Sequence, residues 1–537
     1  MERVRVSDFS GGMNERVDPA LLPASESVEL KNSLTTRGRV VQRSGAVPLG
    51  GASGRPHGLA LYSHPGGPMW FLGAWANALL GTTQPPSWVT LAPGSSLTDA
   101  IHTAVGTRDD KANWLAAVYS VSRPPSELLL VDLSSGAWTQ PSLIAATAVA
   151  SWQGRLWGGG WAHPSLAPDT LAWSRIWDGR DWSGILAQNI RVDPAVGGRL
   201  TAIVPARGAE PMLYLFKERS IYMMRVKWAT DGWLPSTSDA LDLSESLIEN
   251  LSRRVGCVAG GTALWVPSLE GSDVFFLASD GIRSLRRSLD DEAVGGAGPP
   301  LTYDLERVMA RVNWDAIEQA VATVEGTSYY AALPVDGAER PNLVLVKDLV
   351  QASPYRGWSV WDLPTVAIAA DAVPGSRLYY QAATSATEAG YPSDTVHVYR
   401  VDETATVDPG GKDIEFSMTT RSFDLGDPGR RKLWRWFECY LAESCSGSTL
   451  SVDAYLDDDL ESYTAVGATR TQPAQRTVRL PAMLPWNFST EAGQVVKFGL
   501  EALGPSYRIG FRVRSRGGRV TMRHCEVAGQ TVAKEWN

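Results

Sequence analysis

One pattern recurs along most of this chain: a run of apolar residues ends in a polar turn that contains glycine, and an aromatic residue follows. In residues 131–141, "VDLSSGAWTQP", the tryptophan comes two positions after the glycine. Corresponding turns place a large apolar residue at six positions: Trp88, Trp138, Trp182, Trp233, Ile282 and Trp358. Neighbouring positions are 44 to 51 residues apart, except for a last interval of 76 residues. Regular spacing of this kind is typical of a repeat architecture.

The segments between these turns have the length and composition of β-strands. Runs such as "LLLVDL", "DVFFLAS" and "SYYAALPV" are rich in β-branched and aromatic residues. A unit of this length has room for four short strands, which is typical of a β-propeller blade. The chain contains 21 tryptophans, and burying one removes roughly 150–250 Å² of surface from water. We therefore expect each of the six turn residues to close one blade and to wedge it against the next.

The turns divide the central part of the chain into candidate blades. Six to eight blades fit the spacing, and seven are favoured, at residues 56–92, 97–141, 146–186, 198–236, 252–288, 317–363 and 365–403. The last segment lacks the tryptophan, so we expect an N-terminal strand from "GRVVQRSG", residues 38–45, to complete its sheet. Ring closure of this kind covers the exposed strand edges of the first and last blades.

The 76-residue interval contains a segment with helical periodicity. In residues 301–320, apolar side chains recur at a spacing of three to five residues: Leu305, Val308, Met309, Val312 and Ile317. The spacing predicts one helix, inserted between blades near residues 301–316. Such a helix either projects as a contact element or covers the edge of a sheet, and the sequence leaves both alternatives open.

The sequence pattern changes after residue 411, where longer segments of alternating apolar and polar residues begin. In "YRIGFRVRSRG" the apolar residues Tyr507, Ile509, Phe511 and Val513 alternate with arginines, which predicts a sheet with one buried face. Seven such strands fit an antiparallel β-sandwich. The predicted fold is therefore all-β, with an N-terminal arm and ring-closing segment at 1–55, a propeller at 56–411 and a C-terminal β-sandwich at 412–537.

Motifs for catalysis, cofactors and metals are missing from the sequence. The six histidines form no His-Glu-x-x-His motif, and there is no Gly-x-Ser-x-Gly elbow, phosphate-binding P-loop or dinucleotide fingerprint. The four cysteines, at 257, 439, 445 and 525, form no Cys-x-x-Cys pair, and we interpret them as reduced and mostly buried. We therefore predict no catalytic residue, cofactor or metal site, and a protein that is not an enzyme.

Two groups of carboxylates keep other interpretations open. Glycosidases need only two acids roughly 5–10 Å apart, and Asp178, Asp231 and Asp280 lie in corresponding turns. Aspartate before glycine also favours tight turns, and this structural role is our preferred interpretation. The second group, Asp453 with Asp457, Asp458 and Asp459, has the oxygen ligands that Ca²⁺ prefers but lacks a known loop motif, so we expect a solvated hairpin tip.

Charge limits the partners of the chain. The net charge of −8 argues against a protein that wraps DNA, yet an acidic wall lets DNA pass without adhering. The last domain nevertheless has one row of basic residues, Arg508, Arg512, Arg514 and Arg516, continued by Arg519 and Arg523. This basic face would meet an acidic subunit or DNA, or would simply be solvated.

The N-terminus begins with charged residues, and the longest apolar run, "LIAATAVA", is too short to cross a bilayer. We expect no membrane insertion.

The N-terminal segment resembles the opening of the tail nozzle and hub proteins of short-tailed bacteriophages. In that family a Phe-x-Gly-Gly-Met/Leu-Asn stretch precedes a proline turn, a short helix ending in Asn and an Arg-x-Gly motif. The corresponding residues here are Phe9, Gly11, Gly12, Met13, Asn14, Pro23, Asn32, Arg37, Gly38, Arg43 and Gly45. The resemblance extends to "SDGIRSL" and the following helix, to "RGWSVWD" at 356–362 and to "TTRSFDLGDPGRRKLW" at 419–434.

The resemblance implies a structural virion protein in the phage tail, which folds in the host cytoplasm before assembly. The implied assembly is a homo-hexameric ring below the portal and its adaptor, with attachment sites for tail fibres or a needle. Its channel would retain double-stranded DNA and later let it pass non-specifically during ejection. Residues Phe9, Gly11, Gly12, Met13 and Asn14 then form either an arm that reaches an adjacent subunit or an intrachain loop. The alternative functions are a glycoside hydrolase and a propeller that binds glycans or proteins.

Overall fold

The computed structural model describes the following residues: 1–53, 56–63, 68–75, 78–93, 101–107, 114–120, 128–132, 137–139, 146–162, 165–186, 188–206, 212–228, 241, 246–268, 271–293, 296, 298–351, 353–370, 377–382, 395–408, 411–444, 449–466, 470–471 and 494–532.

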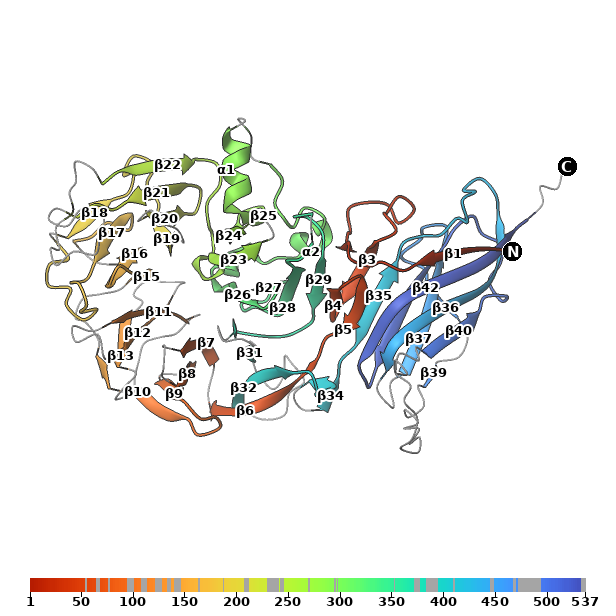
Figure 1. The fold of residues 1–537 in the computed structure, drawn as a ribbon, viewed down its shortest axis with the longest axis horizontal. Helices are drawn as coiled ribbons and strands as arrows, with labels where there is room; N and C mark the ends of the chain where they lie inside the picture. The colour runs from red at the N-terminus through yellow and green to blue at the C-terminus, as the bar shows by residue number, and fades with distance from the viewer. Residues whose placement is uncertain are drawn as a thin grey trace, which may run out of the picture.

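Seven sheets lie around a common axis and form the propeller in the described part of the chain (Figure 1). The first four are antiparallel and have four strands each. Blade one contains β7 (Pro56–Ser63), β8 (Met69–Trp75), β9 (Ala78–Thr82) and β10 (Val89–Pro93). Blade two contains β11 (Ile101–Thr107), β12 (Trp114–Ser120), β13 (Leu128–Asp132) and β14 (Trp138–Thr139). Blade three contains β15 (Ala148–Trp152), β16 (Arg155–Gly159), β17 (Thr170–Trp173) and β18 (Asn189–Arg191). Blade four contains β19 (Leu200–Pro205), β20 (Met212–Lys217), β21 (Ile221–Arg225) and β22 (Ile248–Ser252).

The remaining three blades are less regular. Blade five has three strands, β23 (Leu264–Ser268), β24 (Gly271–Ala278) and β25 (Gly281–Ser284), preceded by the 3-10 turn η1 (Gly260–Thr262). Blade six contains β26 (Val321–Glu325), β27 (Ser328–Leu333), β28 (Leu343–Asp348) and β29 (Trp358–Trp361). Blade seven contains β30 (Ala367–Ala370), β31 (Leu378–Gln381), β32 (Thr395–Asp402) and β6 (Gly45–Ser53). Neighbouring blades contact one another around the ring, through β19 and η1 between blades four and five, and β30 contacts β7, so the ring is closed.

An N-terminal strand closes the ring, but it is not the strand that the sequence suggested. The strand that pairs with β32 is β6, which begins at Gly45. The segment "GRVVQ", from which we expected the closing strand, forms β5 (Arg39–Gln42) in the sandwich. The reason is burial: Val40 is fully buried in the same apolar cluster as Val520 and Met522 of the sandwich. Blade four also ends later than predicted, because its outermost strand, "IENLS", is too polar to show an apolar pattern.

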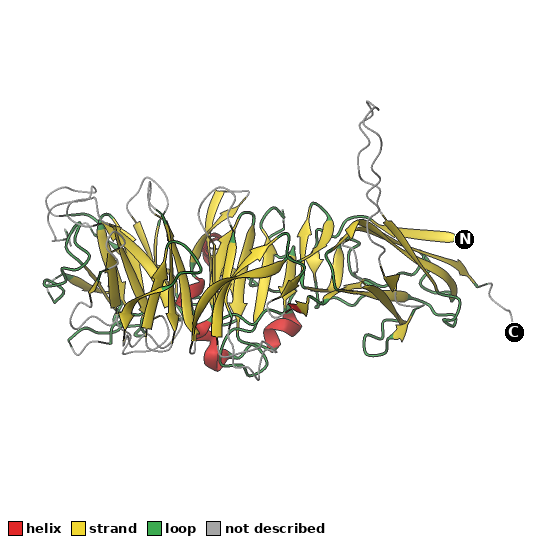
Figure 2. Cartoon of the chain, turned by 90° about the horizontal axis from the view of Figure 1, so that it is seen from below, coloured by secondary structure: helices red, strands yellow, loops and turns green. Residues whose placement is uncertain are grey.

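The helical segment also differs from the prediction. Residues 301–320 contain a short helix, α2 (Glu306–Ala310), and a 3-10 helix, η2 (Trp314–Gln319), in place of one continuous helix. Leu305, Val308, Val312 and Ile317 are all buried, so the apolar spacing reflects packing against the core. A further helix, α1 (Leu285–Ala293), follows β25 directly and contacts β22 and β24. Figure 2 shows the helices at one face of the disc.

The C-terminal domain is a β-sandwich, and N-terminal strands contribute to both of its sheets. One sheet has the order β4 (Ser33–Thr36), β5, β42 (Val520–Thr531), β36 (Lys432–Ser444), β40 (Gln494–Gly499), and β1 (Glu2–Val6) also pairs with β42. The other contains β35 (Phe416–Thr420), β41 (Ile509–Arg516), β37 (Thr449–Leu456), β38 (Thr464–Ala465) and β39 (Arg470–Thr471). A two-stranded ribbon, β33 (Val407–Asp408) and β34 (Lys412–Asp413), precedes the domain. The first and last described strands, β1 and β42, therefore both lie in the sandwich (Figure 1).

The alternation predicted for this segment is confirmed from Ile509 to Val513, whereas Tyr507 lies before β41 and is 41% exposed. Ile509, Phe511 and Val513 are fully buried, and Phe511 stacks on Phe437 of the facing sheet with ring centroids 4.0 Å apart. The arginines of β41 lie on the other face of the sheet. One of the seven strands predicted after residue 411, "RTVRLPAML" at residues 476–484, lies outside the described residues.

Candidate functional site

The propeller and the sandwich are joined by a continuous sheet. Two N-terminal strands, β2 (Gly12–Met13) and β3 (Glu26–Lys31), lie between β29 of blade six and β35 of the sandwich, so that 11 strands form one sheet. Strand β2 runs parallel to both of its neighbours, with Gly12 opposite Trp358 on one side and Glu26 on the other. In Figure 1, β3 and β29 lie at the boundary between the ring and the sandwich. We call the contact region around β2, β3 and β29 the junction.

Gly12 occupies a position that only glycine fits. Its φ is +74°, and a Cβ atom there would come within 2.6 Å of the Trp358 backbone nitrogen and 2.8 Å of the Gly357 Cα. A side chain would therefore separate β2 from blade six.

The segment around Gly12 is buried inside its own chain and does not project as an arm. Phe9 and Met13 are 2% exposed, because their side chains belong to the main apolar cluster. Phe9 N donates to Gly38 O, Gly11 N to Ser25 O, and Asn14 N to Ser27 O. The segment was expected to be either an arm to an adjacent subunit or an intrachain loop, and the structure shows it packed within its own chain.

A group of carboxylates and cations surrounds β2 at the junction. The Glu26 carboxylate accepts from Asn14 Nδ2 at 2.8 Å and pairs with Arg356 Nε at 2.8 Å. Burial raises the pKa of Glu26, Glu15 and Asp304 above the ordinary carboxyl value. Arginine charge opposes this rise at each of the three carboxyls.

Lys347 places a buried amino group beside Arg356 and Trp358. Its side chain is 3% exposed, and its Nζ donates to Arg356 O at 2.6 Å and lies 5.2 Å from the Trp358 ring centroid. Burial lowers the pKa of Lys347 to about 7, although the charges of Asp348 and Asp304 oppose the change.

A second buried network connects the N-terminal segment to three parts of the fold. Asn32 N donates to Val360 O of blade six at 2.7 Å, while Asn32 Nδ2 donates to Glu415 O beside the sandwich at 2.8 Å. The Asn32 Oδ1 atom accepts from Arg43 Nε at 3.0 Å. Arg43 also forms a two-point ion pair with Asp408, at 2.7 and 2.5 Å, with both side chains less than a tenth exposed.

Tryptophan side chains complete the junction. Trp358 is fully buried, and its Nε1 donates to Leu301 O at 2.9 Å. Trp361 Nε1 and Ser359 Oγ both donate to Ser33 O, at 2.9 and 2.7 Å. These three buried donors therefore each have an acceptor, and the junction is held by directed bonds as well as by apolar packing.

The predicted blade-closing residues lie at, or just before, the last strand of their blades. Trp88 precedes β10 and donates from its Nε1 to Leu49 O of blade seven at 3.3 Å. Trp182 lies between β17 and β18, is 5% exposed and belongs to an apolar cluster that includes Ala117 and Leu130 of blade two. Ile282 is fully buried in β25. Trp138 begins β14 and Trp358 begins β29, whereas Trp233 lies outside the described residues.

The predicted basic face is largely neutralised by acids of the same chain. Arg512 and Arg514 both pair with Asp453, at 3.2 and 2.7 Å. Arg508 pairs with Asp458 at 2.6 Å, and Arg516 pairs with Glu415 at 2.9 Å. The Arg512 guanidinium also lies 3.6 Å from the Tyr463 ring centroid. Cross-strand pairing of this kind leaves little net positive charge for a polyanion.

The candidate acids have structural partners. Asp178 Oδ1 accepts from Arg180 N at 3.0 Å within its turn, and Asp280 pairs with Arg283 at 2.5 and 2.9 Å. Asp457, directly after β37, accepts from the backbone nitrogens of Tyr507 and Arg508. Asp453 is 5% exposed within β37, so the expected solvated hairpin tip does not include it. Asp231 lies outside the described residues, within which no group of three or more His, Cys, Asp or Glu side chains is placed to hold a metal ion.

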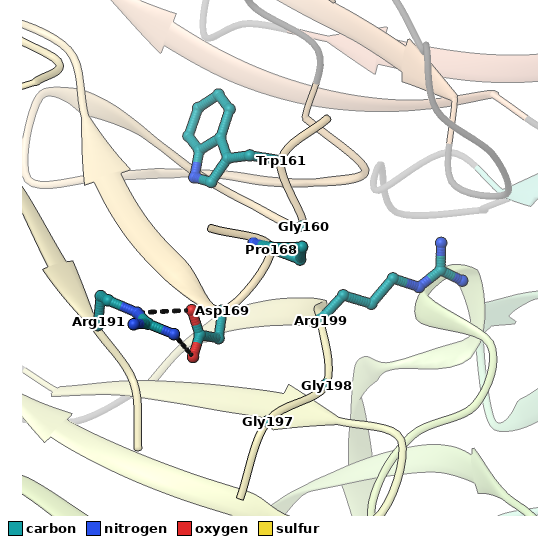
Figure 3. Close-up of a pocket in the computed structure, with 8 residues that line it drawn as sticks. All are labelled: Gly160, Trp161, Pro168, Asp169, Arg191, Gly197, Gly198 and Arg199. Atoms are coloured by element: carbon teal, nitrogen blue, oxygen red, sulfur yellow. Dashed lines mark hydrogen bonds and ion pairs between the residues drawn. The ribbon is translucent and has the colours of Figure 1, made fainter. Parts of the chain in front are cut away.

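A hollow of about 390 Å³ lies between blades three and four (Figure 3). In its wall Asp169 accepts from both Arg191 Nε and Arg191 Nη2, at 3.0 and 2.9 Å. Arg199 extends away from this pair, and its Nη2 donates to Glu318 at 2.6 Å. The other lining residues are Gly160, Trp161, Pro168, Gly197 and Gly198.

Sequence reasoning missed three residues of the junction and the second buried network: Lys347, Asp304 and Asp408. Lys347 ends an otherwise apolar run, "LVLVK", and a charge within such a run is the one local sign that it is buried with partners. Asp304 and Asp408 stand in ordinary turn-like segments. Their roles depend on neighbours that are far away in the sequence.

Within the described residues, every helix is too short or too polar to span a lipid bilayer.

No protein-family model matches this chain, and neither does any curated protein. A solved prolyl endopeptidase is similar over 68% of this chain, with 14% identity and a TM-score of 0.34, and this chain spans about half of it, 53%. The β-propeller domain of the Trilobed protease from Pyrococcus furiosus matches 65% of this chain and 96% of its own length, with 12% identity and a TM-score of 0.28. A glycoside hydrolase matches 90% of this chain and 100% of its own, with 10% identity and a TM-score of 0.23. Such distant likenesses carry no argument about activity. The chain is an all-β protein, in which a β-propeller is followed by a C-terminal β-sandwich.

Proposed function

We propose that this chain is a structural subunit of the tail of a short-tailed bacteriophage and forms part of a nozzle or tube below the portal and adaptor. One observation carries the proposal: the motifs that resemble the nozzle family meet at the junction. The N-terminal Gly-Gly segment, Asn32, Arg43 and the "RGWSVWD" turn come from distant parts of the sequence, and they contact one another there. If these residues hold the propeller and the sandwich at one fixed angle, that common role explains why this chain shares all of these motifs with the nozzle family.

The junction has the physical properties that a conduit subunit requires. Its continuous sheet and buried ion pair resist bending between the two parts, because any rotation would break backbone hydrogen bonds and expose charges. A subunit that keeps its shape can form a ring whose lumen is held open against packaged DNA. The net charge of −8 fits a wall that does not retain phosphate backbones.

The proposal includes a non-enzymatic role in the virion tail. Asp178 and Asp280, the described members of the candidate acid set, stabilise a turn and pair with Arg283. In these roles, each carboxylate stabilises the fold. The proposed partners are further copies of this chain in a ring of six, the portal and adaptor proteins, tail fibres or a needle, and passing double-stranded DNA.

The test is the mass and shape of the purified full chain. Native mass spectrometry and negative-stain imaging, alone and with the portal and adaptor proteins from the same genome, should give rings of six copies seated on the adaptor. A chain that stays monomeric and fails to bind the adaptor would contradict the proposal.

The alternative of a glycoside hydrolase is tested in parallel by reducing-sugar release from host surface polysaccharide. We expect no release. Turnover by the wild-type chain that is lost in folded Asp280→Ala but retained in Asp336→Ala, a matched change at another surface arginine-aspartate pair, would favour the enzyme.

A further inference from the structure

Two cysteines face each other on the central strands of one sandwich sheet. Strands β36 and β42 are antiparallel neighbours, and Cys439 is directly opposite Cys525 in their register. Both thiols are free and fully buried. Directly opposed residues of an antiparallel pair project to the same face of the sheet. Both side chains belong to the main apolar cluster, together with Phe437 and Val527.

The backbone spacing at this pair suits a disulfide. Directly opposed residues of antiparallel strands have Cα atoms roughly 4.5–5.5 Å apart, and disulfides join Cα atoms roughly 4.4–6.8 Å apart. Their Cβ atoms, ordinarily about 4.5–5.5 Å apart, must approach to roughly 3.5–4.5 Å. The register of β36 shifts immediately after Tyr440, and such an irregularity gives the strand local freedom to make this small approach.

We propose that Cys439 and Cys525 form a cross-strand disulfide when the chain folds in the presence of a disulfide oxidant such as oxidised glutathione. The Cys439 thiolate attacks one glutathione sulfur, so that a mixed disulfide forms and one glutathione thiolate leaves. The Cys525 thiolate then attacks the Cys439 sulfur and displaces the second glutathione thiolate. Two cysteine thiols are oxidised, one glutathione disulfide is reduced to two glutathiones, and the two protons released by the cysteines are taken up by the departing thiolates.

The native fold controls when this reaction occurs. Burial raises the pKa of Cys525 to about 12 and raises the pKa of Cys439 well above its ordinary value. Since the thiolate is the reactive form, the folded reduced protein reacts slowly. In the unfolded chain both thiols are accessible to the oxidant. As the chain refolds, the native strand register brings them together before they are buried. The bond, once formed, is equally shielded from reductants.

Cys257 provides an internal control. It is equally buried and has a raised pKa, but it lies in the propeller, and its Sγ donates a hydrogen bond to Ala259 O at 3.1 Å. The three cysteines are therefore similar in burial, and only strand register distinguishes Cys439 and Cys525 from Cys257. Cys445 lies outside the described residues, so every protein in the test has Cys445→Ser.

The test is refolding of the Cys445→Ser protein from denaturant in a glutathione buffer, followed by acid quenching, alkylation of the free thiols in fresh denaturant and intact mass measurement. We expect the refolded chain to lose the mass of two hydrogen atoms and to retain one alkylatable thiol, at Cys257. Tryptic peptides containing Cys439 and Cys525 should remain joined until reduction. The oxidised form should also unfold at a temperature several degrees higher than the reduced form, because the bond closes a long loop.

Matched variants make the outcome decisive. Adding Cys257→Ala should leave the mass loss unchanged, whereas adding Cys525→Ala should abolish it. Three alkylatable thiols in the refolded protein, a bond that involves Cys257, or stable attachment of a single glutathione would each overturn the proposal. If Cys525→Ala does not fold, the position of the cross-link in the parent protein decides the question alone.

Discussion

Gly12 lies against the backbone of Trp358 with no space for a Cβ atom between them. The two residues are 346 positions apart in the sequence, yet they are opposite each other in parallel strands. Their contact is where the N-terminal segment inserts between the propeller and the sandwich. It therefore determines whether the two parts of the molecule form one body.

Replacing Gly12 with alanine should weaken the junction. The new methyl group would meet backbone atoms at 2.6–2.8 Å, in a conformation with positive φ, and we expect a loss of about 3 kcal/mol or more in the free energy of unfolding. Gly326→Ala is the control, because Gly326 also has positive φ but an open surrounding, and it should cost only about 1–2 kcal/mol. Urea unfolding followed by tryptophan fluorescence measures both. Equal losses would contradict the clash at the junction.

The buried pair of Arg43 and Asp408 should be costly to break on one side. Either Arg43→Met or Asp408→Leu leaves an uncompensated buried charge, with an expected loss of about 3–5 kcal/mol. The double variant should lose much less than the sum of the two, and a double-mutant cycle from urea unfolding measures this coupling. The exposed pair Arg311 and Asp336 is the comparison, with an expected coupling below about 1 kcal/mol. Additive losses at Arg43 and Asp408 would disprove the buried pair.

Lys347 should make the free energy of unfolding increase as the pH rises above about 7. Its pKa is about 7 in the folded chain and 10.5 as the ordinary value, so between these values the unfolded chain binds more protons than the folded chain. Stability due to this group must therefore rise as pH increases through and above 7. We expect the free energy of unfolding of the wild type to rise relative to Lys347→Met between pH 6.5 and 9. Parallel curves for the two proteins would contradict a neutral buried lysine.

Trp182 should contribute more to the propeller than an ordinary surface tryptophan does. It is 5% exposed between blades two and three, so Trp182→Ala should cost about 3–5 kcal/mol through the cavity that it leaves. Trp314, which is 37% exposed, gives a matched Trp314→Ala variant with a clearly smaller loss. Thermal unfolding by circular dichroism ranks the two variants. The reverse order would show that Trp182 does not wedge the blades.

Local patterns in the sequence predicted much of the fold. The spacing of Trp88, Trp138 and Trp182 predicted blades, because each large side chain needs a neighbouring sheet on which to pack. The alternation from Ile509 to Val513 predicted a sheet with one buried face, because side chains point to alternate sides of a strand. The helical spacing near Leu305 predicted too long a helix, since burial in a core produces a similar pattern without a continuous helix.

The sequence by itself determined the strand-rich character, the repeated blades and the alternating strands of the sandwich, because these depend on neighbours within a few residues. Only the tertiary structure decided that β6 closes the ring, that β2 and β3 join two domains, and that Arg43 meets Asp408 and Cys439 meets Cys525. Those pairings join segments far apart in the chain. Their partners are selected by register and by the burial of charge and apolar surface across the whole molecule, and no local period encodes that choice.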